Sequence, residues 1–466
     1  MIKMKAGLIL PIALLALLLL YSTSIAGGFN LAGVGAKALS MSGSFRAIAD
    51  DWSAMYWNPA GLAGQESGVW LEAKLLYPMA WATPNASPTT INPDHDVYRL
   101  YRNGIKQSSD EAAFPSGALA FQWKFNEKLT AGISAYAPSA IGLDWTEFYL
   151  GPYESYDENP AYPDIAWSSD MKVLDVHPTV AYKVTDKFKV GLGIALKYAM
   201  IKLQSPKLVP SNDGTGARLP MPAQDFFVDA VLDGDGMGFS FNIGLLYDVT
   251  DNFHVGFCYT GPATIALEGT VKQTLYMPTM AGAGMVEVEP DAKADFPIPM
   301  EYGLGLAYDF NERLTIAGDL SFVNWKALDQ IEIELTGDGL DGGPAENSTL
   351  DLQWKNTLRF NIGANYLLVP EKGMELRLGY YFEPTPIPVE TVRPTITDVT
   401  DKHNFSIGTM LPITSKIFVD AYWEHVWSAD RAVSAFDNDG DGMFDNVPGD
   451  WKMQVDTFGC QFGYRF

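Results

Sequence analysis

The stretch FKVGLGIALKY, from Phe188 to Tyr198, alternates between two kinds of residue along its whole length. Successive side chains of a β-strand point to opposite faces, so every second residue shares a face. One face is apolar and the other is small or basic: Val190, Leu192, Ile194, Leu196 and Tyr198 against Lys189, Gly191, Gly193, Ala195 and Lys197. This pattern is typical of a transmembrane barrel strand, whose outer face meets lipid and whose inner face meets the lumen.

The same alternation recurs on both sides of this stretch. It is found at 117–125, 301–310, 357–366 and 374–382. Strands of a soluble β-sandwich alternate as well. Here, however, the apolar face is large, rich in aromatic residues and repeated on nearly every strand, and the other face offers no second core. The sequence therefore predicts an all-β fold, a transmembrane antiparallel barrel.

Short and long connections between these strands also alternate. Short polar turns are expected at 126–128, 185–187, 250–252, 311–313, 370–372 and 414–415. Long irregular stretches are expected at 78–115, 144–170, 203–236, 271–294, 326–352, 384–401 and 428–451. Outer-membrane barrels have short periplasmic turns, long outer loops and an even number of strands. We therefore predict a barrel of about 14 strands over residues 67–466.

Both ends of the chain indicate export to a bacterial outer membrane. Lys3 and Lys5 precede an apolar run at 6–20, and Ser24-Ile25-Ala26 forms a small-residue cleavage pattern, so residues 1–26 are expected to be a signal peptide. At the other end, DTFGCQFGYRF alternates and finishes on Phe466. A terminal aromatic residue on such a strand resembles the C-terminal signal of bacterial outer-membrane barrels. Outer-membrane lipid and lipopolysaccharide are then the expected surroundings.

Several classes of function are disfavoured by composition and motifs. The net charge of −24 argues against nucleic acid, whose phosphates would be repelled. The two cysteines, Cys258 and Cys460, are too far apart to form a metal or redox motif. The sequence lacks the nucleophile elbow, zinc-protease and phosphate-loop motifs, so we expect neither an enzyme nor a cofactor.

An acidic stretch in the last long loop resembles the start of a calcium-binding loop. It places Asp437, Asp439 and Asp441 two residues apart, with Gly442 next. The twelfth position is Pro448 instead of glutamate, so the EF-hand pattern is incomplete. A structural Ca²⁺ site and simple solvation of an acidic loop both remain open.

The segment from Gly27 to Gly64, GGFNLAGVGAKALSMSGSFRAIADDWSAMYWNPAGLAG, does not have the pattern of a strand. A barrel of about fourteen strands has a lumen too wide for its own side chains to fill. Irregular backbone is tolerated at membrane depth where the barrel shields it from lipid. We therefore expect residues 27–66 to form a plug, or hatch, inside the lumen.

This segment resembles the N-terminal hatch of the FadL/TodX-type outer-membrane transporters, the long-chain fatty acid and aromatic hydrocarbon family. The matching features are Gly28-Phe29, a Gly/Ala/Ser-rich centre, Ala49-Asp50-Asp51 and Asn58-Pro59-Ala60-Gly61. The resemblance implies passive, monomeric uptake of hydrophobic small molecules. Outer loops would capture the ligand, a site beside the hatch would bind it, and a kinked third strand would release it sideways. The resemblance places the ligand gate at Gly28, Phe29, Leu31, Asp50, Asp51, Asn58, Pro59, Ala60 and Gly61.

The third strand, expected from Leu129, contains Pro138, which cannot donate a ladder hydrogen bond and favours an edge, a bulge or a bend. We expect a kink at Tyr136, Pro138 and Ser139 that supplies the lateral opening. The alternative is a proline close to the outer rim.

Partners for the hatch residues are less constrained by the sequence. Asn58 is expected to anchor a turn to the wall, and Asp50 and Asp51 are assigned to lumen cations such as Lys124, Lys197 or Arg359. The fourth long loop carries Met277, Met280 and Met285, which could form an adaptable groove for apolar ligands or pack on neighbouring loops.

The sequence leaves alternatives open for both the ligand and the functional class. The carboxylate-binding positions of the family match no local motif here, so the sequence does not separate a fatty acid from a hydrocarbon. The competing functional class is an open general porin or a structural outer-membrane protein.

Overall fold

The computed structural model describes residues 29, 32–85, 104–145, 167–210, 225–277, 284–395, 398–436 and 446–466. Several of the predictions fall on other residues. The expected signal peptide lies outside the described residues, as do Gly28, Leu31, Met280, Asp437, Asp439 and Asp441.

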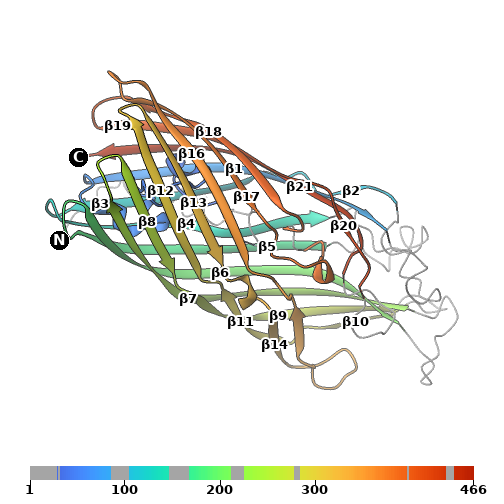
Figure 1. Ribbon diagram of the computed structural model, residues 1–466. Coiled ribbons are helices and arrows are strands. Elements are labelled where there is room, and N and C mark those ends of the chain that lie inside the picture. Colours follow the sequence, from blue (N-terminus) through green and yellow to red (C-terminus); the bar gives the residue numbers. More distant parts are fainter. Residues whose placement is uncertain are drawn as a thin grey trace.

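The wall is a closed antiparallel barrel of 14 strands (Figure 1). In order around the wall the strands are β1 (Gly68–Pro84), β3 (Phe114–Lys124), β4 (Leu129–Trp145), β5 (Trp167–Lys183), β6 (Phe188–Pro210), β7 (Asp225–Asp248), β8 with β9 (Phe253–Thr260, Ala263–Met277), β12 with β11 (Glu301–Asn311, Asp291–Ile298), β13 with β14 (Leu314–Val323, Gln330–Thr336), β16 with β15 (Thr357–Val369, Ser348–Asp351), β17 (Met374–Glu383), β18 (Lys402–Pro412), β19 (Ile417–Ser428) and β21 (Gly449–Arg465). The barrel closes where β21 pairs with β1 along 17 residues. Three short strands lie in outer connections: β2 (Gln107–Ser108), β10 (Gly284–Val288) and β20 (Arg431–Val433).

All six predicted short turns are confirmed, and they lie together at one end of the barrel (Figure 1). The predicted bounds of the long irregular stretches are wrong, because strands extend into them or lie within them. Strands β6 and β7 extend to 23 and 24 residues, and β10, β14 and β15 lie where irregular loops were expected. Beyond the lipid a strand no longer needs an apolar outer face, so the alternation that reveals it disappears.

The outward face of the wall is apolar, as the alternation predicts. Leu192, Ile194 and Leu196 are 44–55% exposed on β6, whereas Ala195 and Lys197 between and beside them are buried. At the short-turn end Phe466 contacts the rings of Trp123 and Phe121 at 5.7 and 6.2 Å. Aromatic residues at this level are typical of the membrane–water interface. None of the helices in the described residues combines the length and hydrophobicity needed to cross a membrane.

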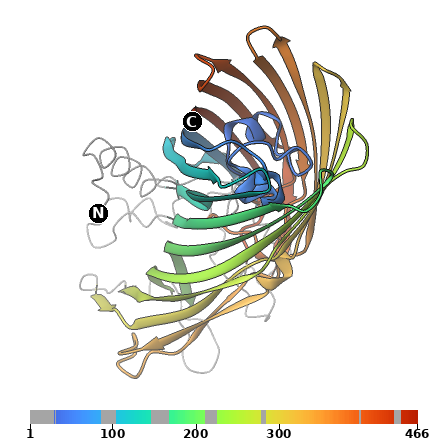
Figure 2. The same cartoon turned by 90° about the vertical axis from the view of Figure 1, so that its left-hand side faces the viewer.

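The N-terminal segment lies inside the barrel (Figure 2). It contains helix α2 (Ala36–Ser40), helix α3 (Ala54–Trp57) and the 3₁₀ helix η1 (Pro59–Leu62). Its large side chains are enclosed, and Phe45, Trp52 and Trp57 are at most 1% exposed. The core of the hatch is therefore enclosed by the wall and by the hatch itself.

Glycines of the wall make this close packing possible. A Cβ atom at Gly191 would collide with the backbone of Pro59, and one at Gly244 would collide with Asn58. The same holds for other inward-facing wall glycines against hatch atoms: Gly132, Gly256, Gly303, Gly305, Gly363, Gly379 and Gly408. Gly191 and Gly193 were expected to face the lumen, and this is confirmed. The small residues that decide the fit belong to the wall as much as to the hatch.

We expect the substitution Gly191→Val to displace η1 from the wall, because its side chain would occupy the space of the Pro59 backbone. The measurement is ion conductance in planar bilayers, which should rise as the plug loosens. Gly318→Val is the matched control, since a Cβ there meets only an ordinary contact at 3.5 Å. Equal conductance of both variants and the wild type would contradict this account of the packing.

Candidate functional site

Buried apolar side chains pack together inside the barrel in one cluster, which we call the apolar chamber. Its members include Phe29, Leu143, Trp145, Trp167, Met171, Ile265, Phe296, Ile298, Trp325, Leu328, Leu352, Trp354, Tyr381, Ile387, Trp451 and Met453. These residues come from wall strands all around the barrel and from the connections between them. A lumen that served only hydrated ions would have a polar lining here. The chamber therefore suits an apolar occupant.

Phe29 reaches across the base of this chamber. Its ring lies 5.3 Å from that of Phe296, 5.0 Å from Trp325 and 6.0 Å from Trp354. Its carbonyl accepts a hydrogen bond of 3.0 Å from the backbone N–H of Ala140 on β4. The N-terminal end of the hatch is thus held by β4 on one side and by an aromatic cluster on the other, which comes from β11 and from the connections that follow β13 and precede β16.

Strand β4 is irregular at the expected kink. Its pairing with β5 shifts between Tyr136 and Ser139, so that β4 has one residue more than its partner. Its pairing with β3 ends at Tyr136, although both strands continue beyond this point. Ala140, whose N–H binds Phe29, lies beyond the last residue of β4 that pairs with β3. The backbone ladder between β3 and β4 is therefore interrupted beside Phe29.

Asn58 holds the hatch to the wall. Its side-chain amide donates to the carbonyl of Arg46 at 2.7 Å and to the carbonyl of Leu245 on β7 at 3.0 Å. Its Oδ1 accepts from the N–H of Ala60 at 3.2 Å, which caps η1. One buried side chain therefore joins two parts of the hatch to a wall strand.

A second anchor was not anticipated from the sequence. The guanidinium of Arg46 forms ion pairs with Glu301 on β12 and, at 3.2 Å, with Asp319 on β13. Asp319 also accepts from the backbone N–H groups of Phe45 and Arg46. The signal that could have revealed it is a pair of acidic residues at inward positions of neighbouring strands, together with a lone arginine in the hatch.

The predicted partners of Asp50 and Asp51 are wrong. Asp50 pairs with Lys37 of the hatch at 2.7 Å, and Asp51 accepts from the backbone and hydroxyl of Ser53. Burial raises the pKa of Asp51 to about 6, against the hydrogen bonds from Ser53 that lower it.

Two of the three assigned cations already have other partners. Lys124 pairs with Glu66 and Glu127 at the rim, and Lys197 pairs with Asp175 at 2.7 Å. Arg359 contacts neither aspartate. Asp50 and Asp51 therefore stabilise the hatch itself.

A hydrogen-bonded chain links the kink to the hatch. The hydroxyl of Tyr136 lies 2.5 Å from Nδ1 of His177, whose Nε2 lies 3.2 Å from Oδ1 of Asn242. The amide of Asn242 in turn donates to the carbonyl of Met55 at 2.8 Å. An amide oxygen can only accept, so Nε2 carries the proton and Nδ1 accepts from the tyrosine. The ring of Tyr56 also packs edge-on against Tyr136 at 5.7 Å.

A small crevice lies between the hatch and the wall. A crevice of about 60 Å³ runs past Arg46, Tyr136, Pro138, His177 and Glu301. This volume holds a few water molecules at most, since one water needs roughly 10–15 Å³ of such space. Passage of a larger molecule through this crevice requires the hatch or the wall to move.

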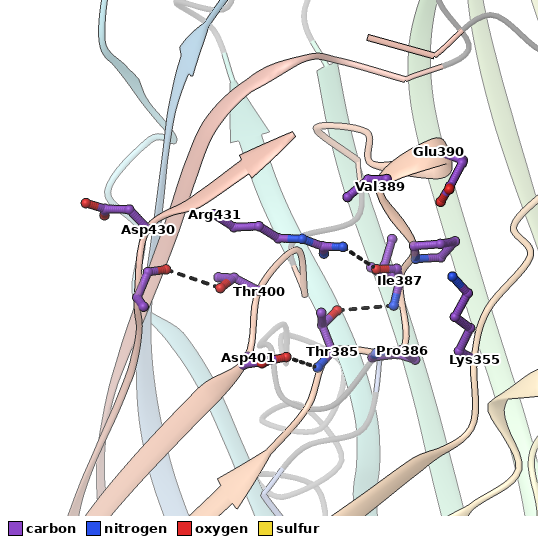
Figure 3. A pocket seen from close by; sticks show the side chains of 12 residues that line it. Lys355, Thr385, Pro386, Ile387, Val389, Glu390, Thr400, Asp401, Asp430 and Arg431 are labelled. Carbon is purple, nitrogen blue, oxygen red and sulfur yellow. Dashed lines mark hydrogen bonds between the residues drawn. The ribbon is translucent and has the colours of Figure 1, made fainter. Parts of the chain in front are cut away.

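A larger hollow of about 480 Å³ lies at the outer rim (Figure 3). Its wall is largely polar: the guanidinium of Arg431 donates to the carbonyls of Ile387 and Val399, and Asp401 accepts from the N–H of Thr385. The Arg431 contacts tie the β17–β18 connection to β20, and the Asp401 contact lies within that connection. A hollow of this polarity does not match an apolar ligand.

The remaining predicted sites are the methionine groove of the fourth long loop and the calcium site. Met277 ends β9 and faces the start of β10, where Met285 is 63% exposed. The structure thus brings these two methionines into one hairpin. Within the described ranges, groups of three or more His, Cys, Asp or Glu residues that could hold a metal ion are absent.

Replacing Asn58 by alanine should loosen the hatch without unfolding the barrel. The carbonyls of Arg46 and Leu245 would lose their donor. The expected loss of hatch stability is about 2–4 kcal/mol, because each buried polar group left unpaired costs roughly 1–3 kcal/mol. Faster protease cleavage within the hatch would measure it. Asn311→Ala, which removes a turn-capping side chain at the exposed rim, is the control. Unchanged cleavage in Asn58→Ala would show that this anchor is dispensable.

Comparison with known proteins agrees with this architecture. The chain is 22% identical to a putative outer membrane protein of Neisseria meningitidis serogroup B, over 98% of this chain and 99% of that protein. It is 20% identical to the long-chain fatty acid transport protein of Escherichia coli K12, over 94% of this chain and 93% of that protein.

Solved structures share the fold at low sequence identity. A Pseudomonas aeruginosa FadL homologue superposes with a TM-score of 0.75 at 16% identity, covering 94% of this chain and all of that one. The Pseudomonas putida toluene transporter TodX gives a TM-score of 0.69 at 17% identity, covering 94% and 99%. The sequence profile described as outer membrane protein transport protein (OMPP1/FadL/TodX) matches residues 17–466. The chain therefore belongs to this family of outer-membrane proteins.

Proposed function

We propose that this protein is a passive outer-membrane transporter for hydrophobic small molecules, either long-chain fatty acids or hydrocarbons. The observation that carries the proposal is an apolar chamber that ends at an interruption of the barrel wall, beside Phe29. Two relatives or fold neighbours carry names of this kind, a long-chain fatty acid transport protein and a toluene transporter.

The proposed route begins at the outer loops. Met285, which is 63% exposed on β10, offers an adaptable apolar side chain for capture, and Met277 pairs in the ladder with Gly284, the residue before it. The ligand then enters the apolar chamber and displaces the ring of Phe29 from its aromatic neighbours. The polar rim hollow around Arg431 takes no part in this step.

Release is proposed to occur sideways, between β3 and β4. When Phe29 moves, the Ala140 N–H is freed and the unpaired edge of β4 opens toward lipid. The chain from Tyr136 through His177 to Asn242 keeps the kinked strand in contact with the hatch during this movement. The driving force is the transfer of the ligand from water into lipid, so no nucleotide or cofactor is needed.

A closed barrel has no free strand edge for subunit pairing, which favours a monomer.

An open porin is the alternative, and the packed hatch argues against it. The crevice of about 60 Å³ beside the hatch is too small for a stream of hydrated ions. Low conductance together with apolar molecules that co-purify, identified by mass spectrometry, is the result we expect. High steady conductance without a bound apolar molecule would favour the porin.

Deletion of Pro138 tests lateral release. The pairing of β4 with β5 shifts by one residue between Tyr136 and Ser139, so removal of one residue restores a continuous register. Leu143 and Trp145 keep their inward orientation, because a bulge is one extra residue and its loss preserves the alternation on both sides. Uptake of radiolabelled palmitate or toluene by cells should fall to background while the purified protein still binds the ligand.

Pro138→Ala is the matched control, since it removes the ring but keeps the extra residue and therefore the bulge. It should retain most of the uptake. If the deletion variant is inserted in the membrane, binds ligand and transports as well as the wild type, the lateral route is wrong.

A further inference from the structure

Four stacked rings form a column on the outside of the barrel, across β18 and β19. The ring of His403 stacks on that of Trp427 at 5.5 Å, and Trp427 also stacks on His425 at 5.6 Å. The ring of Trp423 follows at 5.9 Å from His425. We call these four residues the ring column.

The ring column faces away from the lumen. The residues that alternate with it along the two strands face the lumen and are at most 3% exposed: Lys402, Asn404, Glu424, Val426 and Ser428. His403 is the second residue of β18 and Trp427 the second-last of β19, so the column lies at the ends of these strands that carry long connections. Long connections of an outer-membrane barrel are extracellular. The ring column therefore lies at the level of the outer head groups, where the membrane lipid is lipopolysaccharide.

Two imidazoles at this position need a polar partner outside the protein. Nδ1 of His403 lies 2.8 Å from the hydroxyl of Tyr380, and Nδ1 of His425 lies 3.0 Å from a carboxylate oxygen of Asp456. Within the described ranges, Nε2 of neither ring has a hydrogen-bond partner. Against acyl chains alone, each Nε2 would be an unpaired polar group away from water, which costs free energy. The histidines therefore suit a polar head group and not a hydrocarbon tail.

Two lysines lie beside the ring column. Lys452 on β21 lies two residues nearer the outer end than the residue that pairs with Trp427. Lys452 also pairs in the ladder with Trp81 of β1, and the ammonium of Lys106 lies 5.2 Å from the centre of the Trp81 ring. Lys106 is exposed, and Lys452 has an exposed pair with Asp430 at 3.6 Å, which is weak in water. On a chain of net charge −24, these lysines and the two histidines form a local basic region that suits phosphate.

The polar hollow at the outer rim continues the ring column beyond the strand ends (Figure 3). Two of its lining residues extend the outward rows of the same strands: Asp401 precedes His403 by two positions, and Ala429 follows Trp427 by two. Both are exposed. The hollow of about 480 Å³ has the size of a small-ligand site, and its polar lining suits hydroxyl-rich groups.

We propose that this side of the wall binds one lipopolysaccharide molecule. The glucosamine rings of its lipid A stack on the ring column, and its phosphates pair with the histidines, Lys452 and Lys106. Its acyl chains lie along the apolar wall nearer the short turns, where Phe405 and Phe458 are 39% and 53% exposed. Its sugar core enters the polar hollow. This site lies outside the barrel and is independent of the proposed transport.

Native mass spectrometry of the full chain in detergent, titrated with lipid A, tests the ring column. The double variant His403→Leu with His425→Leu should raise the dissociation constant roughly 10–100-fold, because it removes two hydrogen bonds to a charged group. Tyr302→Leu is the matched control. Tyr302 is 41% exposed on the outside of β12, and its ring lies 4.9 Å from that of Tyr259, in a cluster of tyrosines. Its replacement should leave the constant unchanged.

A second variant tests the phosphate contacts and changes only the two exposed lysines. The wild type should bind lipid A with two phosphates more tightly than monophosphoryl lipid A. In Lys106→Gln with Lys452→Gln this difference should disappear, since the charges that distinguish the two lipids are gone.

A third variant tests the hollow. The wild type should bind lipopolysaccharide that carries its sugar core more tightly than lipid A. Ala429→Trp places a large side chain in the hollow and should remove this gain while the affinity for lipid A is kept.

Three results would overturn the proposal. The first is an equal affinity for lipid A in the wild type, the histidine variant and Tyr302→Leu. The second is equal binding of phosphatidylglycerol and lipid A by the wild type, which would make the ring column an unspecific aromatic belt. The third is an unchanged preference for two phosphates in the lysine variant, and this result decides the question even if the histidine variant fails to fold. An unchanged gain from the core in Ala429→Trp would exclude the hollow from the site.

Discussion

The close contact between the hatch backbone and the inner wall is the constraint on which the rest of the structure depends. A barrel of 14 strands encloses more space than its inward side chains can fill. Wall glycines such as Gly191 and Gly244 allow the hatch to approach to backbone distance, and Asn58 and Arg46 then fix it by hydrogen bonds and ion pairs. Glycine in a strand is unfavourable on its own, so its repeated use here reflects this fit.

A fixed plug divides the lumen into two levels with different chemistry. Below, polar contacts between hatch and wall leave a crevice of about 60 Å³. Above, an apolar chamber ends at Phe29, which bridges from an aromatic cluster to the unpaired edge of β4. A molecule in the apolar chamber would therefore meet the closely packed hatch below it and, at the side, the interrupted backbone pairing between β3 and β4. The difference in backbone pairing at these two boundaries is the physical reason to expect a lateral exit.

Much of the wall could be predicted from the sequence, because alternation and turn residues are local signals. The inward position of Gly191 and the kink region around Pro138 follow from such patterns. The partners of Asp50 and Asp51 could not be predicted, since alternation shows which face a residue occupies but not which hatch atom it meets. The pairing of Arg46 with Glu301 joins residues 255 positions apart and leaves no local trace. The outer ends of β6 and β7 were missed because strands outside lipid need no apolar face.

Hydrogen exchange of the hatch in lipid nanodiscs tests the central claim most directly. Peptides from residues 32–67 should be protected to nearly the same degree as those from the wall strands, because their N–H groups are buried and many are bonded within the hatch or to the wall. Exchange of these peptides within seconds, alongside a protected wall, would mean that the segment does not fill the bore, and the account of the chamber and its exit would fail with it.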